Sequence, residues 1–520
     1  MNNYILTFDL GTGGSRASLY DENGDCVGSI FEEVNTRYSV TDCHEQRPDA
    51  WWEAIAASSR TLLKLVRSEV DFNPDHIACI GVGGHSLGTV PLDASGELLR
   101  EWTPIWSDGR AFREANEFFS RMDSDTWYER TGAGVPSGNY PAFKLLWFKG
   151  HEPDLYSKIA SVLGTKDYIN YKLTGVLATD PSCAGNYGIW NLKEACYDQE
   201  ILELLGLPRT FFPGVLPSTA IIGTLCAESA RLMGLPAGIK VINGGVDNCC
   251  IALGARAWKS GRLAASLGSG SWVAVSSEQP QTNLQTRPFI YPHVVPGQFL
   301  CSVGVFATGT TLRWVKNELC RNIVMAAEAS GRNPYFMLSK EARKSGIGAG
   351  GLIFNPCFGG PSTSNDPAGI RGTFWGLSLR HTQADVIRAV FEGIAMAVRV
   401  AFDDLKSLGP VEGPINVVGD TLSELLRNIY VHILNYPIYA GYKSVSVPSL
   451  GIAALAAVGA GFWEDFSPIE KINRNDEALI TPDPGCAERY NQVYYLFKKA
   501  ARFGAEMARE ASSEIVIDEI

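Results

Sequence analysis

A glycine-rich turn between two strand-like runs occurs twice in this chain, and this repeat constrains the fold more than any other feature. The first copy lies between Tyr4 and Tyr20 and contains Asp9-Leu10-Gly11-Thr12-Gly13. The second copy, Ser266-Leu267-Gly268-Ser269-Gly270, precedes the strand-like run Ser271–Val275. Alternating apolar residues on both sides of a short turn indicate a β-hairpin. Two related hairpins predict two related domains.

The composition of the first turn suits the binding of a phosphorylated ligand. Gly11, Gly13 and Gly14 allow backbone N–H groups to approach a ligand closely, and Thr12 and Ser15 add hydroxyl groups. Asp9, at the end of the preceding strand, would repel phosphate unless a divalent cation lay between them. The turn therefore indicates metal–nucleotide binding, with an ordinary β-turn and a solvated Asp9 as the alternative.

A second carboxylate, Asp247, follows a short apolar strand and the pair Gly244-Gly245, and it precedes the apolar run Cys249–Ala255. An acid held at the start of a buried segment has a raised proton affinity and suits general-base catalysis. The alternative is that Asp247 only caps the following helix.

Taken together, these three sites resemble the FGGY family of carbohydrate kinases, which belongs to the actin-like ATPase folds. The resemblance covers nearly the whole chain, because further short segments match the family in order and spacing: Trp106–Arg110, Lys144–Trp147, Lys166–Tyr168, Leu173–Gly175, Thr179–Ser182, Asp366–Gly372, Gly376–Leu377 with His381, and Arg388–Gly393.

The resemblance implies an α/β fold with two actin-like ATPase (ribonuclease H-like) domains flanking a central catalytic cleft. We expect residues 1–253 to bind the sugar and carry the first phosphate turn and the catalytic Asp247, and residues 254–520 to bind the nucleotide. The implied cofactors are ATP and Mg²⁺, with Asp9 and Asp247 on the metal. The implied nucleotide-binding residues are Thr12, Gly13, Gly14, Ser15, Gly268, Ser269, Gly309 and Gly419.

The implied sugar-binding residues are His85, Ser86, Trp106, Asp108, Asp247 and Asn248. Xylulose kinases typically carry Gln-Met-His where this chain has His85-Ser86-Leu87, so the substrate is less defined than the reaction. We expect Arg110 to form a buried ion pair with Asp108. Tyr140 and Lys144 are further candidates, although Lys144 can equally be a solvated helix residue.

The family's triple-glycine run for adenosine is replaced here by Gly419-Asp420, which leaves the choice of nucleotide open. Whole-chain similarity favours a ketopentose such as D-xylulose as substrate, with another polyol or autoinducer-2 as alternatives. The altered adenosine turn raises a different alternative, a sugar and nucleotide sensor without turnover. A chaperone-type ATPase fits less well, because Trp106–Arg110 matches the sugar kinases.

Bulk composition is compatible with such an enzyme. The net charge of −11 argues against nucleic acid or an anionic membrane as a partner. The twelve cysteines show no metal-type spacing, and most are expected to be reduced core residues. No signal peptide is evident, and the longest uncharged apolar stretch, 450–463, is too short to span a membrane. We therefore expect a cytoplasmic enzyme acting on a small sugar, with a homodimer as an open option.

Overall fold

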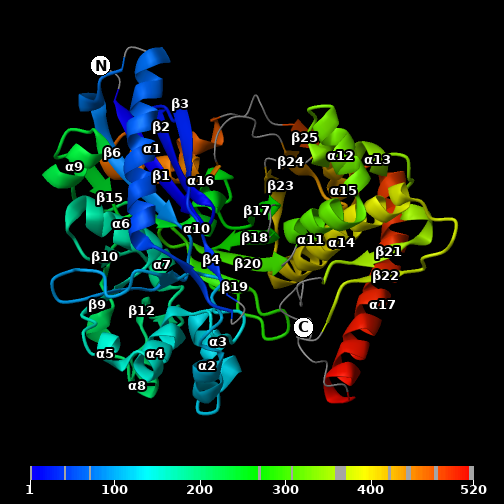
Figure 1. Cartoon of the computed structure of the whole chain (residues 1–520), viewed down its shortest axis with the longest axis horizontal. Helices are drawn as coiled ribbons and strands as arrows, with labels where there is room; N and C mark the ends of the chain where they lie inside the picture. The colour runs from blue at the N-terminus through cyan, green and yellow to red at the C-terminus, as the bar shows by residue number, and fades with distance from the viewer. Residues whose placement is uncertain are drawn as a thin grey trace.

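The chain forms two α/β lobes that lie side by side (Figure 1). The computed structural model describes residues 3–39, 42–69, 72–267, 271–305, 308–357, 370–419, 423–440, 447–472 and 478–514. Within these residues, no helix combines the length and the apolar character that crossing a bilayer requires.

The first lobe is built on a seven-stranded sheet whose main path runs β14-β15-β6-β1-β2-β3, with β16 paired to β6. Its central strands are antiparallel from β1 to β3 and parallel from β1 through β6 to β15. The strands are β1 (Tyr4–Gly11), β2 (Gly14–Asp21), β3 (Cys26–Glu33), β6 (Ile77–Gly84), β14 (Ile221–Thr224), β15 (Lys240–Ile242) and β16 (Gly245–Val246).

The second lobe repeats this arrangement in a seven-stranded sheet ordered β19-β20-β18-β17-β23-β24-β25. Strands β17, β18 and β20 are antiparallel, and β17, β23 and β24 are parallel, so each has a counterpart in the first sheet. The strands are β17 (Arg262–Leu267), β18 (Ser271–Ser277), β19 (Phe289–Pro292), β20 (Phe299–Val305), β23 (Glu412–Val418), β24 (Ile438–Ala440) and β25 (Ala478–Ile480). The repeated hairpin thus marks a repeated domain topology.

Corresponding long helices cover one face of each sheet. Helix α1 (Pro48–Glu69) packs on β2 and β3, and its stripe of Trp51, Ile55 and Leu62 is buried there. Helix α14 (Gln383–Leu408) packs on β18 and β20 in the second lobe and also contacts α15 (Glu424–Leu434). Helix α1 buries its apolar side against the sheet and leaves its polar side in water. The middle of α14, residues 387–398, is buried on all sides.

Two helices join the lobes. Helix α16 (Val447–Ala460) comes from the second half of the sequence, yet it packs on β1 and β6 of the first sheet (Figure 1). The absence of side chains at Gly81 and Gly83 makes room for Ile452, because an added Cβ would lie 2.7 and 2.6 Å from its side chain.

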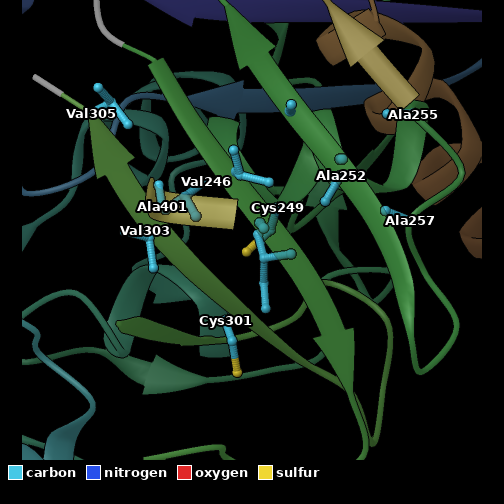
Figure 2. Close-up of a cluster of buried hydrophobic side chains, with 14 of the residues drawn as sticks. Val246, Cys249, Ala252, Ala255, Ala257, Cys301, Val303, Val305 and Ala401 are labelled. Atoms are coloured by element: carbon cyan, nitrogen blue, oxygen red, sulfur yellow. The ribbon is translucent and has the colours of Figure 1, made fainter. Parts of the chain in front are cut away.

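Helix α10 (Asp247–Gly254) packs against α16 and also contacts β17. Figure 2 shows Val246 and Cys249 in one apolar cluster with Val303 of β20 and Ala401 of α14. Helix α10 therefore lies where the two lobes meet, and it begins at one of the two acids singled out above.

The other elements form smaller sheets and the remaining helices, of which α6 and α7 are largely buried. They are β4 (Arg37–Tyr38), β5 (His44–Gln46), β7 (Val90–Leu92), β8 (Thr103–Pro104), β9 (Ser161–Leu163), β10 (Ala178–Thr179), β11 (Trp190–Asn191), β12 (Cys196–Tyr197), β13 (Gly214–Val215), β21 (Ile353–Asn355), β22 (Thr373–Trp375), α2 (Phe112–Phe119), α3 (Ser124–Thr131), α4 (Pro141–His151), α5 (Pro153–Tyr156), α6 (Thr165–Thr174), α7 (Pro181–Ala184), α8 (Gln199–Leu205), α9 (Ala227–Met233), α11 (Thr308–Trp314), α12 (Arg321–Ala329), α13 (Pro334–Ala342) and α17 (Pro484–Glu514).

The predicted two-domain α/β architecture is confirmed. The division after residue 253 stays a prediction, and the return of α16 to the first sheet shows that the two lobes are not simple consecutive halves of the sequence.

Candidate active site

The sheet register brings the two candidate acids to the same edge of the first sheet. Asp9 on β1 lies beside Gly83 on β6, and Gly83 lies beside Gly245 on β16. These strands are parallel, so their carboxyl ends meet, and Asp247 follows β16 as the first residue of α10. Carboxyl ends of parallel strands are the usual place for ligand binding in α/β sheets.

Burial shifts the protonation of both carboxylates, and the charge of Asp9 adds to the shift at Asp247. Burial raises the pKa of Asp9 to about 6, although nearby Arg16 opposes the shift. Burial, and then the negative charge of Asp9, raises the pKa of Asp247 to about 7. Because burial disfavours the ionised form of both acids, a bound cation would stabilise their ionised forms.

Asp247 does not occupy the cap position of its helix. Val246 is the cap residue, and Asp247 Oδ1 accepts a hydrogen bond from the Asn248 N–H at 2.8 Å. The structure thus places Asp247 within the first turn of α10, and it places Asn248 directly beside it.

The segment before Asp247 is fixed by a glycine in a conformation that other residues avoid. Gly244 has a φ of +72°, and a Cβ at this position would overlap the carbonyl oxygen of Val82. Asn243 is fully buried, and its Nδ2 donates to the carbonyl oxygens of Thr179 and Leu216 at 2.8 and 2.9 Å. The approach to Asp247 is therefore held rigidly against the first sheet.

A buried polar network supports the same segment. Ser182 Oγ accepts a hydrogen bond from the Val246 N–H at 3.0 Å and donates to Asp180 at 2.6 Å. Lys166 is 1% exposed, lies 3.1 Å from Asp180 and is also paired with Asp167. The sequence showed these residues only as segments typical of a family, and no local signal indicated that they support Asp247.

The first glycine turn connects the two strands of a hairpin, as expected. Gly11 pairs with Gly14, which leaves Thr12 and Gly13 at the tip. Gly14 has no room for a side chain, because a Cβ would overlap the carbonyl oxygen of Glu32. Ser15 is buried, and its hydroxyl has no hydrogen-bond partner within the described residues. The turn thus has an open tip and a tightly packed base.

Trp106 contacts this turn directly. Its indole Nε1 donates a hydrogen bond to Thr12 Oγ1 at 2.8 Å, although the two residues are 94 positions apart. The Trp106 side chain is 41% exposed, so its ring remains accessible. A candidate sugar-binding residue and a candidate phosphate-binding residue are therefore in contact.

Asp108 forms the expected buried ion pair with Arg110. Arg110 Nε and Nη2 donate to the two Asp108 oxygens at 2.9 and 2.7 Å, and the His44 N–H adds a bond at 2.7 Å. Arg110 also pairs with Glu45 at 2.7 Å and lies over the Trp147 ring. This network holds the Trp106 loop in place, and a direct contact of Asp108 with sugar stays a prediction.

His85 is buried between helices. Its ring packs edge-on against Trp51, its Nδ1 lies 3.2 Å from Thr165 Oγ1, and burial lowers its pKa to about 4. Its Nε2 has no partner within the described residues. Neutral His85 thus has a buried ring nitrogen without a partner among the described residues, and Ser86 is partly exposed beside it. A hydrogen bond from His85 to a sugar stays a prediction.

Lys144 is buried, not solvated. Its Nζ donates to the carbonyl oxygens of Leu87 and Ile105 at 3.1 and 2.7 Å, and burial lowers its pKa to about 7. Lys144 thereby ties the loop after β6 to the loop that carries Trp106. A lysine next to three apolar residues gave no sequence signal for this role.

The nucleotide side is only partly described. Gly268 and Ser269 lie outside the described residues. Gly419 follows β23, and a Cβ there would lie 2.8 Å from the carbonyl oxygen of Leu267, the residue that precedes the second turn. Gly309 lies in the first turn of α11, where Thr308 Oγ1 contacts Ser271 Oγ at 2.8 Å. Gly419 and the start of the second turn are thus brought together.

Known proteins match the chain over nearly its whole length. The family models described as the N-terminal and C-terminal domains of the FGGY family of carbohydrate kinases match residues 4–254 and 263–460. A xylulose kinase from Staphylococcus xylosus is 26% identical over 498 residues, which cover 95% of this chain and 99% of the relative.

A gluconokinase from Bacillus licheniformis is equally similar, at 26% identity over 507 residues and 96% of both chains. The crystal structure of a xylulose kinase from Rhodospirillum rubrum superposes with a TM-score of 0.85 at 28% identity, over 98% of this chain and 100% of the other. Relatives with different sugar substrates therefore share this fold at similar levels of identity.

Proposed function

Because the chain belongs to the FGGY family of carbohydrate kinases, sugar phosphotransferases of actin-like fold that use ATP as phosphate donor, we propose that it transfers the γ-phosphoryl group of ATP to a hydroxyl of a small sugar at the Asp9–Asp247 site.

The observation that carries this proposal is the meeting of two carboxylates, Asp9 and Asp247, at the carboxyl end of one sheet, beside the glycine turn. Asp247 accepts the proton of the sugar hydroxyl as the oxygen bonds to the γ-phosphorus, and the bond from that phosphorus to ADP breaks. A base with a pKa near the working pH suits this step, because it is ionised and can still take up the proton.

The raised pKa values of Asp9 and Asp247 fit a divalent cation, because both carboxylates gain from a nearby positive charge. Asp9 and Asp247 would hold Mg²⁺, which, when bound, neutralises charge on the transferred phosphoryl group. Thr12, Gly13, Gly14 and Ser15 would contact phosphate from the first lobe. Gly268, Ser269, Gly309 and Gly419 would hold the nucleotide from the second.

We propose a neutral ketopentose such as D-xylulose as the substrate, contacted by His85, Ser86, Trp106, Asp108 and Asn248. Among the described residues, the cations that contact the Trp106 loop include Arg110 and Lys144, and both have other partners: Arg110 pairs with Asp108 and Glu45, and Lys144 donates to two carbonyl groups. A sugar acid would need a free cation there. Gluconate is the second candidate, because a gluconokinase is as similar to the chain as a xylulose kinase.

The test is ADP production with Mg-ATP across a panel of ketopentoses, polyols, gluconate and the autoinducer-2 precursor. We expect turnover with a ketopentose and background hydrolysis with the other compounds. Turnover with gluconate alone would support the second candidate. A folded, nucleotide-binding protein without sugar-dependent turnover would contradict the kinase proposal and support a sensor.

A further inference from the structure

Thr12, at the tip of the first glycine turn, is held at two points by side chains from outside the turn. Trp106 Nε1 donates to its hydroxyl oxygen at 2.8 Å, and Gln46 Nε2 donates to its carbonyl oxygen at 2.7 Å. Gln46 is fully buried and is itself fixed by the Trp51 indole N–H at 2.8 Å. The turn is therefore preorganised before any ligand binds.

The chemistry of the Trp106 contact decides what the Thr12 hydroxyl can do. An indole N–H is only a donor, so Thr12 Oγ1 must accept this bond with a lone pair. The hydroxyl proton then remains available, and no acceptor for it is found within the described residues. A hydroxyl with a free proton at the tip of a glycine turn matches an anionic oxygen, to which hydrogen bonds are strongest.

The loop carrying Trp106 is anchored independently of the turn. Asn139 Nδ2 donates to the Trp106 carbonyl oxygen at 3.2 Å, and the next residue, Ser107, contacts His44 Nδ1 at 2.9 Å. Arg110 and Lys144 fix the same loop from inside the protein. The backbone of the loop is thus held by the protein, while the Trp106 side chain is 41% exposed and a ligand can still restrict its orientation.

We propose that Trp106 is a positioning residue that orients the Thr12 hydroxyl toward the nucleotide phosphates and so couples sugar binding to nucleotide binding. This inference rests on the proposed function, because it takes the ligand at Thr12 to be ATP and the ligand beside the indole to be the sugar. A sugar that orders the indole also orders its bond to Thr12. By linkage, each ligand then strengthens binding of the other by the same factor.

Calorimetric titration with the magnesium complex of a non-hydrolysable ATP analogue, with and without the sugar that supports turnover, tests the proposal. Trp106→Phe keeps an aromatic ring but removes the N–H, and we expect nucleotide affinity to fall about three- to tenfold, the value of one hydrogen bond. The strengthening by sugar should disappear in the same variant. Thr12→Ser keeps the hydroxyl and should lose less nucleotide affinity than Thr12→Val.

Two further variants separate this role from a loss of fold. Trp258→Phe removes an indole bond of the same kind, to Glu470 at 3.1 Å, away from the turn, and should match wild type in both titrations. Thr12→Val removes the hydroxyl, and adding Trp106→Phe to it should cause no further loss, because both changes break one interaction. Thermal melting of each variant checks that the fold is retained.

Wild-type nucleotide affinity in Trp106→Phe, with only sugar affinity reduced, would overturn the proposal. Additive losses in the double variant would overturn it as well. The nucleotide-only titration decides the role of the Trp106–Thr12 bond even if no sugar supports turnover. If no sugar supports turnover, that finding contradicts the kinase proposal and also the proposed coupling between sugar and nucleotide binding.

Discussion

The carboxyl ends of the two central sheets have the same connectivity and different chemistry. In the first sheet, Asp9 lies between Arg16 of β2 and Gly83 of β6. In the second sheet, the corresponding residue of β17 is Ser266, which lies between Trp272 and Val418. The duplicated topology therefore places a carboxylate at one end and a hydroxyl at the other.

The carboxyl ends of the two sheets have similar backbone geometry, but their side chains differ in charge. Gly84 closes β6 beside Leu10, and Gly419 follows β23 against Leu267, so both ends exclude side chains where the parallel strands finish. Open backbone suits phosphate at both ends, whereas two coupled acids occur at the first. Under the proposed function, both ends would contact nucleotide and the first would perform the chemistry.

The largest expected effect on stability comes from distorting the backbone turn that leads to Asp247. Gly244→Ala places a Cβ on the Val82 carbonyl oxygen at a positive φ, and we expect a loss of at least about 3 kcal/mol of stability. Gly238→Ala is the matched control, because its φ is +88° and nothing lies within 4 Å. It should cost only about 1 kcal/mol. Urea unfolding measures both, and equal losses would contradict the claim.

Sequence patterns predicted the two hairpins, because the period of apolar residues and the chemistry of a turn are local. They also predicted that Asp9 and the glycine turn act together, since these residues are neighbours in the chain. They did not predict that α16 lies on the first sheet. Its apolar sequence has no polar face, so nothing in it specifies which surface it covers.

The support of the site was also invisible in the sequence. The Lys166, Asp180 and Ser182 network depends on contacts between residues far apart, and charged side chains are usually exposed. The expectation that Lys144 can be solvated was wrong for the same reason: its partners are carbonyl groups of two distant loops. Local patterns identify which residue types suit the chemistry, and long-range packing decides how they are held.

At the second sheet end, Gly419→Ala should weaken nucleotide binding selectively. The added Cβ would lie 2.8 Å from the Leu267 carbonyl oxygen and displace the start of the second turn. Overpacking of this kind costs about 1–3 kcal/mol, so we expect the KM for ATP to rise roughly tenfold or more. Steady-state kinetics with both substrates varied measures this. An equal rise in the KM for sugar would contradict the division of roles.

The charge of Asp9 raises the pKa of Asp247, so removing this charge should change the pH dependence of activity. The value of kcat/KM for Mg-ATP at saturating sugar reports the enzyme before nucleotide binds, so in wild type it should fall as pH drops through about 7, the pKa of Asp247. Asp9→Asn removes the negative charge that raises this pKa, and the acid limb should move to lower pH. An unchanged limb would show that the two carboxylates do not interact.

The smallest effect concerns stability without ligands. Asp247 has a raised pKa when folded, about 7 against 3.8, so its contribution is favourable at low pH and is lost as pH rises through 7. Asp247→Asn should therefore stabilise the nucleotide- and metal-free protein at pH 8, by about 1 kcal/mol for a partly exposed group, and by less at pH 5. Denaturant unfolding at both pH values measures this, and lower stability at pH 8 would contradict the prediction.

The most direct test of the account is sugar-dependent turnover in Asp247→Asn compared with Asp404→Asn. Both carboxyls have pKa values raised mainly by burial, but Asp404 lies on α14, away from the sheet ends. We expect Asp247→Asn to lower kcat by about 10²–10⁴, as for loss of a general base, and Asp404→Asn to retain wild-type turnover. Near-normal turnover in a folded Asp247→Asn variant would show that the first sheet end does not perform the chemistry.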